Sequence, residues 1–210
     1  MTSRSEPRLY ETIHRRRDVR AQFPGDPIPT EALERVLGAA HAAPGVGLSQ
    51  PWDFIVVQDR AIRQAFHDHV QAERSVFAAS LEGARAALFR DIKVEGVLDS
   101  TLSVVVTYDA ERGSPDVLGR HAIADAGLYS VCLAIENLWL AATAEGLGVG
   151  WVSFYREDFV AELIGLPRGI RPVAWLCLGP VSHLEPRPDL ERYGWRSRMA
   201  LADVVHHDRW

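Results

Sequence analysis

Four arginines fall within six residues near the start of the chain, in the segment Arg15-Arg16-Arg17-Asp18-Val19-Arg20. Guanidinium groups this close repel one another, so such a cluster is stable either in solvent or around an anion. The planar fork of arginine matches phosphate in a bidentate way. Asp18, the one acid in the run, could neutralise a neighbour or transfer protons. The alternative is a solvated basic helix end, which the helix dipole favours.

A second basic group, Arg192, Arg196 and Arg198, lies near the far end of the chain. The formal net charge is −5, which argues against a general nucleic-acid binder. Two separate basic groups in an acidic protein suit a doubly charged phosphate, although each also fits ordinary surface charge.

Two further segments combine small residues with hydrogen-bonding groups. In Pro44 to Trp52, small residues let a backbone approach a planar ligand, and Ser49 and Gln50 could bond its polar atoms. In Gly148-Val149-Gly150-Trp151-Val152-Ser153, a glycine-flanked strand could line a flat cavity with the serine at its edge. The alternatives are a loop with a core tryptophan and a simple helix-to-strand connection.

Other chemistries find little support. His67, His69 and the pair His206-His207 lack a carboxylate or cysteine at metal-ligand spacing, so we expect no metal site. There is no Gly-x-Ser-x-Gly elbow and no P-loop. The run Gly146-x-Gly148-x-Gly150 has the wrong context for a dinucleotide fingerprint.

Apolar spacing and turn residues predict helices and strands without regular βαβ alternation, which indicates an α+β class. The helix expected from Ala122 to Glu145 is apolar nearly all round, so we place it at the centre of the core. Thr30 is predicted to cap the second helix. The other expected helices cover Pro7 to Arg16, Arg60 to Arg90 with a break near Ser75 or Gly83, and Glu157 to Ile164. The expected strands cover Phe54 to Val57, Leu102 to Tyr108, Val149 to Phe154 and Val173 to Leu178.

The length of 210 residues fits a single domain, 1–210, and from about Pro180 onward the chain reads as an extended tail. Its apolar residues would be poorly buried alone, so we expect the tail, 180–210, to wrap a partner in a homodimer; they are Trp195, Met199, Leu201 and Trp210. Cys132 and Cys177 lie in apolar stretches and are expected to be buried free thiols. The polar start and the lack of a run near 20 apolar residues favour a cytoplasmic protein with no membrane contact.

Taken together, the arginine run, Pro44 to Trp52 and Gly148 to Ser153 resemble segments of the nitroreductase-like flavoproteins. More narrowly, the chain resembles the 5,6-dimethylbenzimidazole synthases, a likeness that extends from about Arg15 to Arg198. The narrower likeness adds Lys93 to Gly96, Val117 to Arg120, Leu128 to Cys132, Glu136 to Ala142 and Gly194 to Arg196.

This resemblance implies a dimeric sandwich in which helices flank a central mixed, mostly antiparallel sheet, with FMN at the subunit interface. It implies that reduced FMN is the substrate, which dioxygen fragments to 5,6-dimethylbenzimidazole and erythrose 4-phosphate. The alternative is an NAD(P)H-dependent nitroreductase that keeps its FMN. Whether NAD(P)H or a separate flavin reductase supplies the reduced flavin stays open.

The resemblance places the catalytic residues at Asp18 and Ser153. Neighbouring arginines should depress the pKa of Asp18, so the carboxylate would act first as a base. The residues that would contact the flavin are Arg16, Arg17, Asp18, Val19, Arg20, Pro44, Gly45, Ser49, Gln50, Gly150, Trp151, Val152, Ser153, Arg196 and Arg198.

The chain departs from the pattern at four places. Gly45 stands where the synthases commonly have serine, and Ser49 stands where they have methionine, which removes a donor and a cover from the flavin. Asp99-Ser100-Thr101 and Ala122 to Gly127 also differ. Asp18 itself agrees with the synthases, since the broader family usually has serine there.

Overall fold

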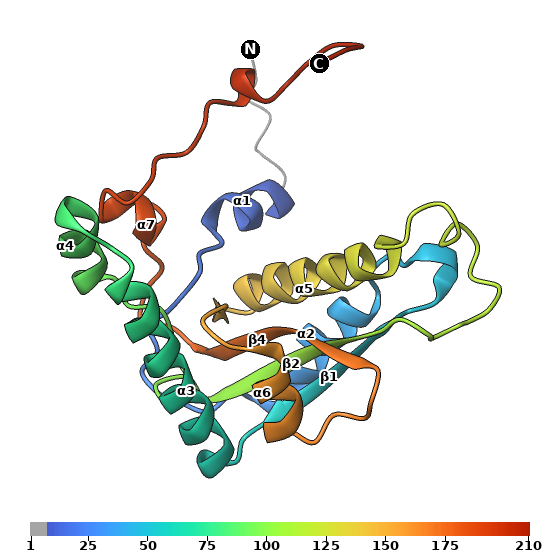
Figure 1. The fold of residues 1–210 in the computed structure, drawn as a ribbon, viewed down its shortest axis with the longest axis horizontal. Coiled ribbons are helices and arrows are strands. Elements are labelled where there is room, and N and C mark those ends of the chain that lie inside the picture. Colours follow the sequence, from blue (N-terminus) through green and yellow to red (C-terminus); the bar gives the residue numbers. More distant parts are fainter. Residues whose placement is uncertain (1–7) are drawn as a thin grey trace.

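The computed structural model describes residues 8–210, and a four-stranded sheet forms its centre (Figure 1). The strands are β1 (Trp52–Val57), β2 (Leu102–Asp109), β3 (Leu147–Val152) and β4 (Ile170–Pro180). Their order is β1-β2-β4-β3, and all neighbours are antiparallel. A parallel bridge between Asp18 and Val149 adds the arginine segment beside β3. The predicted α+β class and mostly antiparallel sheet are therefore confirmed.

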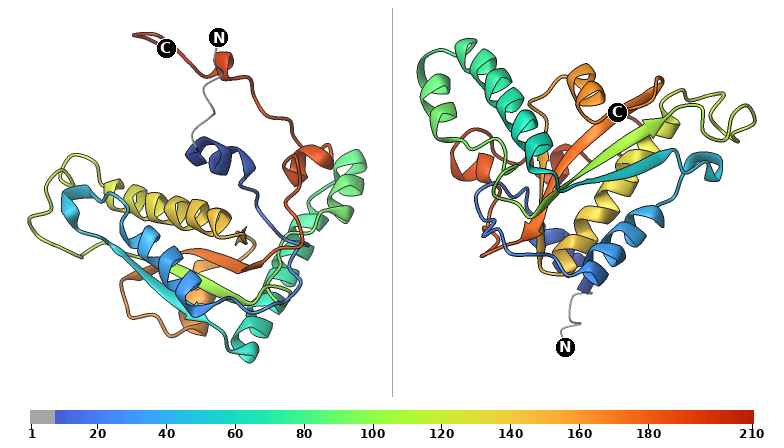
Figure 2. Two further views of the ribbon diagram at one scale, coloured as in Figure 1. Left: turned by 180° about the vertical axis from the view of Figure 1, so that it is seen from behind. Right: turned by 90° about the horizontal axis from the view of Figure 1, so that it is seen from below.

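Helices cover both faces of this sheet (Figure 2). They are α1 (Arg8–Arg15), α2 (Thr30–His41), α3 (Arg60–Ala79), α4 (Gly83–Asp91), α5 (Ala126–Ala144), α6 (Glu157–Leu163) and α7 (Asp189–Arg192), with short 3-10 turns η1 (Val46–Leu48) and η2 (Leu201–Asp203). Helices α5 and α2 pack together on one face, and α3 and α6 lie on the other.

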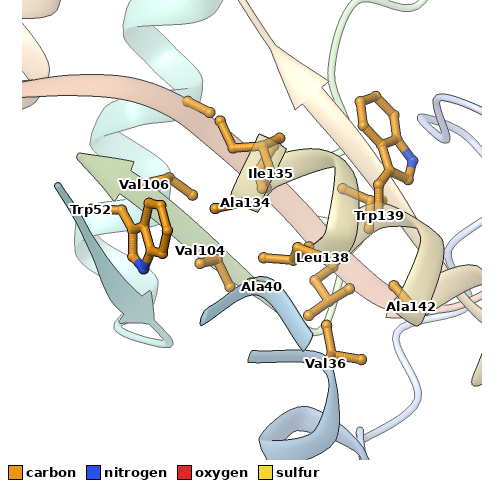
Figure 3. Close-up of a cluster of buried hydrophobic side chains, with 14 of the residues drawn as sticks. Val36, Ala40, Trp52, Val104, Val106, Ala134, Ile135, Leu138, Trp139 and Ala142 are labelled. Carbon is orange, nitrogen blue, oxygen red and sulfur yellow. The ribbon is translucent and has the colours of Figure 1, made fainter. Parts of the chain in front are cut away.

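The two faces of the sheet carry two apolar cores. Val104 and Val106 of β2 point into the core beneath α5, where Leu138 and Val36 join them (Figure 3). Val105 points into the opposite core. Because both faces are covered, β2 is a nearly continuous apolar run rather than an alternating one.

Several predicted boundaries change. Of the two positions predicted to break the helix from Arg60 to Arg90, Gly83 is confirmed: α3 ends at Ala79, and α4 begins at Gly83, whose φ is +54°. Ser75 does not break α3, because its hydroxyl donates to the carbonyl of Gln71 within the helix, 2.9 Å away. Thr30 is not the cap of α2: it is the first helical residue, Pro29 holds the cap position, and no side chain caps the helix.

Helix α5 is buried on one side only, which corrects its predicted place at the centre of the core. Tyr129 and Leu133 on its outer face are 56% and 47% exposed. Cys132 is exposed as well, so its predicted burial is wrong, whereas Cys177 is buried as expected. Within residues 8–210, α5 is the one helix long and apolar enough to cross a membrane by length and composition, contrary to expectation. Its packing on the sheet and α2 is that of a core helix.

The first part of the tail packs against α3 and α4 of its own chain. Trp195 lies against Phe77 and Phe89, and the Arg85 guanidinium carbon stands 4.5 Å from the centre of its ring. Trp195 is therefore partly buried within its own chain, contrary to the expectation that it would be poorly buried alone. Further along, Met199, Leu201 and Trp210 remain exposed.

Candidate functional site

The arginine run divides into side chains that anchor the segment and side chains that face open space. The Arg15 guanidinium donates to the Thr143 carbonyl at the end of α5, 2.9 Å away. Arg17 donates to the carbonyls of His14 and Pro186, at 2.7 and 2.6 Å. These bonds tie the segment to α5 on one side and to the tail on the other.

Arg16 and Arg17 face a pocket of about 470 Å³ together with Arg198 from the tail. Arg16 stacks over Trp139, 4.8 Å from the ring centre. Burial, followed by the positive charges of Arg198 and Arg16, lowers the pKa of Arg17. Arg187 lines the same pocket, and so do the carboxylates of Glu136, which lies 3.8 Å from Arg16, and Glu191. Four guanidinium groups against two carboxylates leave the pocket basic, which is the arrangement that a bound anion stabilises.

The second basic group contributes unequally. Arg198 lines the pocket, whereas Arg196 is exposed and lies outside its lining. Arg192 is engaged with Glu185 and Asp189, at 3.0 and 2.7 Å. The two basic groups, which are distant in sequence, therefore meet as predicted, and Arg198 is the residue of the second group that meets the first.

Asp18 lies next to this pocket with both carboxylate oxygens engaged. One oxygen forms an ion pair with Arg20, and the other accepts the backbone N–H of Trp151 at 3.0 Å. Burial raises the pKa of Asp18, although Arg20, the Trp151 N–H and Arg16 act in the opposite direction. The direction is opposite to the expected depression: desolvation is the largest influence on the pKa of this carboxyl, whose side chain is 32% exposed, and the arginines offset it only in part.

The glycines of β3 allow the Asp18 segment to approach this closely. A Cβ atom on Gly150 would stand 2.1 Å from the carbonyl oxygen of Val19, and one on Gly148 would meet Val181 at 2.3 Å. The Val19 N–H donates to the Val149 carbonyl at 2.9 Å. Gly150 thus leaves room for the Val19 backbone, and Gly148 leaves room for the side chains of Val19 and Val181, so both glycines let the Asp18 segment lie against β3.

Ser153 follows β3 and lines a separate pocket of about 260 Å³. Arg20, the ion-pair partner of Asp18, lines the same pocket, so Arg20 links the two predicted catalytic residues. The other lining side chains are almost all apolar; they are Phe77, Phe89, Ile92, Val94, Phe154, Leu190 and Trp195.

The loop from Pro44 to Gln50 lies at the other end of α5 from Asp18. The Val46 N–H donates to Ser130 near the start of α5, whereas the Trp139 indole donates to the carbonyl of Arg17. The nine residue steps from Ser130 to Trp139 span about 13 Å along a helix. Within a single chain, this loop and Asp18 therefore lie apart.

Within the loop, the Ser49 hydroxyl is buried and donates to the Val46 carbonyl, 2.8 Å away. Gly45 has room for a side chain, because an added Cβ would meet only ordinary contacts at 3.5 Å. The departure at Ser100 also has a structural role: its backbone and side chain meet the guanidinium of buried Arg63.

Two side chains of the site carry no signal of their own in the sequence. Trp139 supplies the ring beneath Arg16, and its helical spacing is that of any core residue. His41, the last residue of α2, contacts Gln50 and Trp52 through both ring nitrogens. Among residues 8–210, no group of three His, Cys, Asp or Glu is arranged to hold a metal ion.

The sequence and the fold of this chain match a known class of protein. Residues 13–180 match the nitroreductase family, and the chain belongs to that family. A 5,6-dimethylbenzimidazole synthase of Rhodospirillum rubrum is 39% identical over 183 residues, covering 87% of this chain and 86% of the relative. A synthase of the same name from Rhodobacter capsulatus is 32% identical, covering 91% and 92%.

Solved structures agree on the fold. Iodotyrosine deiodinase bound to FMN and 3-iodo-L-tyrosine superposes with a TM-score of 0.77 at 20% identity, covering 96% of this chain and all of that one. A BluB-like flavoprotein of Clostridium difficile superposes with a TM-score of 0.71 at 21% identity, covering 96% and 99%. This chain therefore has the same α+β architecture as these structures.

Proposed function

We propose that this protein breaks reduced FMN down with dioxygen to 5,6-dimethylbenzimidazole and erythrose 4-phosphate. The observation that carries the proposal is the Asp18 carboxyl, held between Arg20 and the Trp151 N–H beside a pocket lined by four arginines. Relatives named as 5,6-dimethylbenzimidazole synthases support it over most of the chain.

The arginine pocket fits the phosphate of FMN. Four arginines and two glutamates line this space, so it carries a net positive charge. The Nε atom of Arg17 is buried without a hydrogen-bond partner among the described residues. A phosphate supplies several acceptor oxygens and two negative charges, so it satisfies donors and charge together. Arg196 lies outside the lining of this pocket, so it would contact the phosphate only if the tail moved.

Asp18 is proposed as the group that moves protons during fragmentation. Its raised pKa lets the carboxyl hold a proton nearer to neutrality than an ordinary aspartate, and ionisation makes it a base. Reduced FMN, when bound, supplies the electrons that dioxygen accepts. Arg20 orients the carboxylate, and its Nε atom is also buried without a partner among the described residues. Ser153 offers a hydroxyl at the edge of the neighbouring apolar pocket.

The full site is proposed to form between two copies of this single-domain chain. The outer face of α5 exposes Tyr129 and Leu133, and the Pro44 to Gln50 loop lies at one end of that helix with Asp18 at the other. Two α5 helices packed antiparallel would bring the loop of one chain to the Asp18 of its partner. The exposed Met199, Leu201 and Trp210 would then lie against the second subunit.

The test is to mix the purified protein with reduced FMN in air and to separate the products by chromatography. We expect 5,6-dimethylbenzimidazole from the wild type and none from Asp18→Asn, with FMN still bound by the variant. Asp68→Asn is the matched control, because Asp68 is an exposed aspartate on α3 that meets only Gln64.

Intact FMN as the sole product would contradict the proposal. Steady NAD(P)H consumption with a nitroaromatic and a retained flavin would then support the conventional nitroreductase, an activity that the family match also allows. The source of the reduced flavin is tested by starting from oxidised FMN, with NAD(P)H alone or with NAD(P)H and a separate flavin reductase. Product with NAD(P)H alone shows that the protein reduces its own flavin, and product only with the added reductase shows that it does not.

A further inference from the structure

His41 lies between the core and the proposed flavin-facing loop and contacts both. The buried Trp52 indole N–H donates to His41 Nδ1 at 3.2 Å. On the other side of the ring, His41 Nε2 stands 3.4 Å from the amide nitrogen, Nε2, of Gln50. The imidazole therefore connects a fixed core residue to a residue predicted to contact FMN.

This geometry determines where the imidazole proton lies. An indole N–H can only donate, so Nδ1 of His41 must be the acceptor, and a neutral ring then carries its hydrogen on Nε2. His41 is exposed, so an N–H on Nε2 can donate to solvent or to the Gln50 amide, the protein group that stands opposite it. Half a turn of the amide about its last bond brings the Gln50 oxygen to His41 as an acceptor, whereas the amide nitrogen there would set two donors against each other.

The backbone of Gln50 has little freedom to respond otherwise. Its φ is +45°, in the left-handed region that non-glycine residues rarely adopt. Arg112 donates to the carbonyls of Gln50 and Trp52, at 3.1 and 2.7 Å. With the backbone held in this way, the direction of the amide group depends on the contact with His41.

We propose that His41 is a positioning residue, which holds the Gln50 amide with its NH₂ group pointing outward as a hydrogen-bond donor. The acceptor would be a carbonyl oxygen or ring nitrogen of the flavin held by the second copy of the chain, so this part rests on the proposed function. The flavin ring is rich in such acceptors, and a glutamine presented the other way round would meet them with an oxygen.

The first test measures the proton itself. In protein labelled with ¹⁵N-histidine, a long-range ¹H–¹⁵N spectrum near neutral pH separates the two neutral forms of imidazole, and His41→Ala identifies the signals of this ring. We expect hydrogen on Nε2. Hydrogen on Nδ1, or on both nitrogens, would overturn the proposal.

The second test measures coupling between the two residues through the dissociation constant of oxidised FMN. His41→Ala and Gln50→Ala should each weaken binding about fivefold, the effect of one ordinary hydrogen bond. The double variant should bind no more weakly than Gln50→Ala alone, because His41 acts through Gln50. His207→Ala, an exposed histidine in the tail, is the matched control and should bind like the wild type.

A purely structural role for His41 gives a different pattern. If His41 only supports Trp52, the two effects multiply to about 25-fold in the double variant. That result, or wild-type affinity in His41→Ala, would overturn the positioning role. A wild type that binds no FMN would overturn the proposed function and the flavin contact, whereas the spectrum would still show which nitrogen of His41 carries the proton.

Discussion

Gly150→Ala should displace the catalytic aspartate without touching it. The added Cβ would lie 2.1 Å from the carbonyl oxygen of Val19, and a backbone oxygen cannot rotate away as a flexible side chain can. The segment that carries Asp18 must therefore move away from β3, or β3 must bend.

The size of the effect follows from what this movement breaks. The Val19-to-Val149 backbone bond contributes about 1 kcal/mol, and the Trp151 N–H bond to the charged Asp18 about 1.5–3 kcal/mol. Overpacking alone costs about 1–3 kcal/mol. Because either bond survives a partial shift, we expect the free energy of unfolding to fall by about 2–4 kcal/mol.

The assay combines urea denaturation with 5,6-dimethylbenzimidazole formation, which should fall at least about tenfold as the carboxyl moves. Gly38→Ala is the control, because Gly38 is exposed in α2 with nothing within 4 Å of an added Cβ. It should raise the stability by about 0.5–1 kcal/mol and leave product formation unchanged. Wild-type stability and product formation in Gly150→Ala would refute the argument that this glycine positions Asp18.

Three other predictions concern the same site. Arg198→Ala should weaken FMN binding about tenfold or more, through the loss of a charged hydrogen bond, and Arg196→Ala should weaken it much less. Equal losses of affinity in the two variants, measured by fluorescence titration, would contradict the role of Arg198 in phosphate binding. Because burial favours the neutral Asp18 carboxyl, product formation should decline on acidification at a pH above the ordinary aspartate value of about 3.9; a decline that begins only below it would count against the raised pKa. Gly45→Ser should fold normally and bind FMN more tightly, by about fivefold for one new hydrogen bond, because the position has room for a Cβ; loss of folding by circular dichroism would contradict this.

The strands and the long helices could be predicted from the sequence, because their periodicity and composition are local properties. The β-branched run of β2 and the apolar run of β4 fell where they were expected. The one-sided burial of α5 could not be predicted, since an apolar outer face and an inner face have the same composition. Only the packed chain distinguishes them.

The candidate site could likewise be predicted from the sequence only in part. Asp18 and the arginines stand out by residue type, but the sign of the shift in the pKa of Asp18 depends on desolvation by segments far away in the chain. The role of Gly150 depends on the Val19 backbone, 131 positions earlier, and no local pattern carries that contact. Charge is a property of the sequence, whereas burial and close approach are properties of the fold.

The central claim is that this protein consumes its flavin, and a mass balance tests it most directly. A known amount of reduced FMN is mixed with the protein in air, and both the remaining flavin and the 5,6-dimethylbenzimidazole are quantified by chromatography. The account predicts that flavin disappears in step with the appearance of 5,6-dimethylbenzimidazole. Full recovery of FMN with no benzimidazole would contradict it.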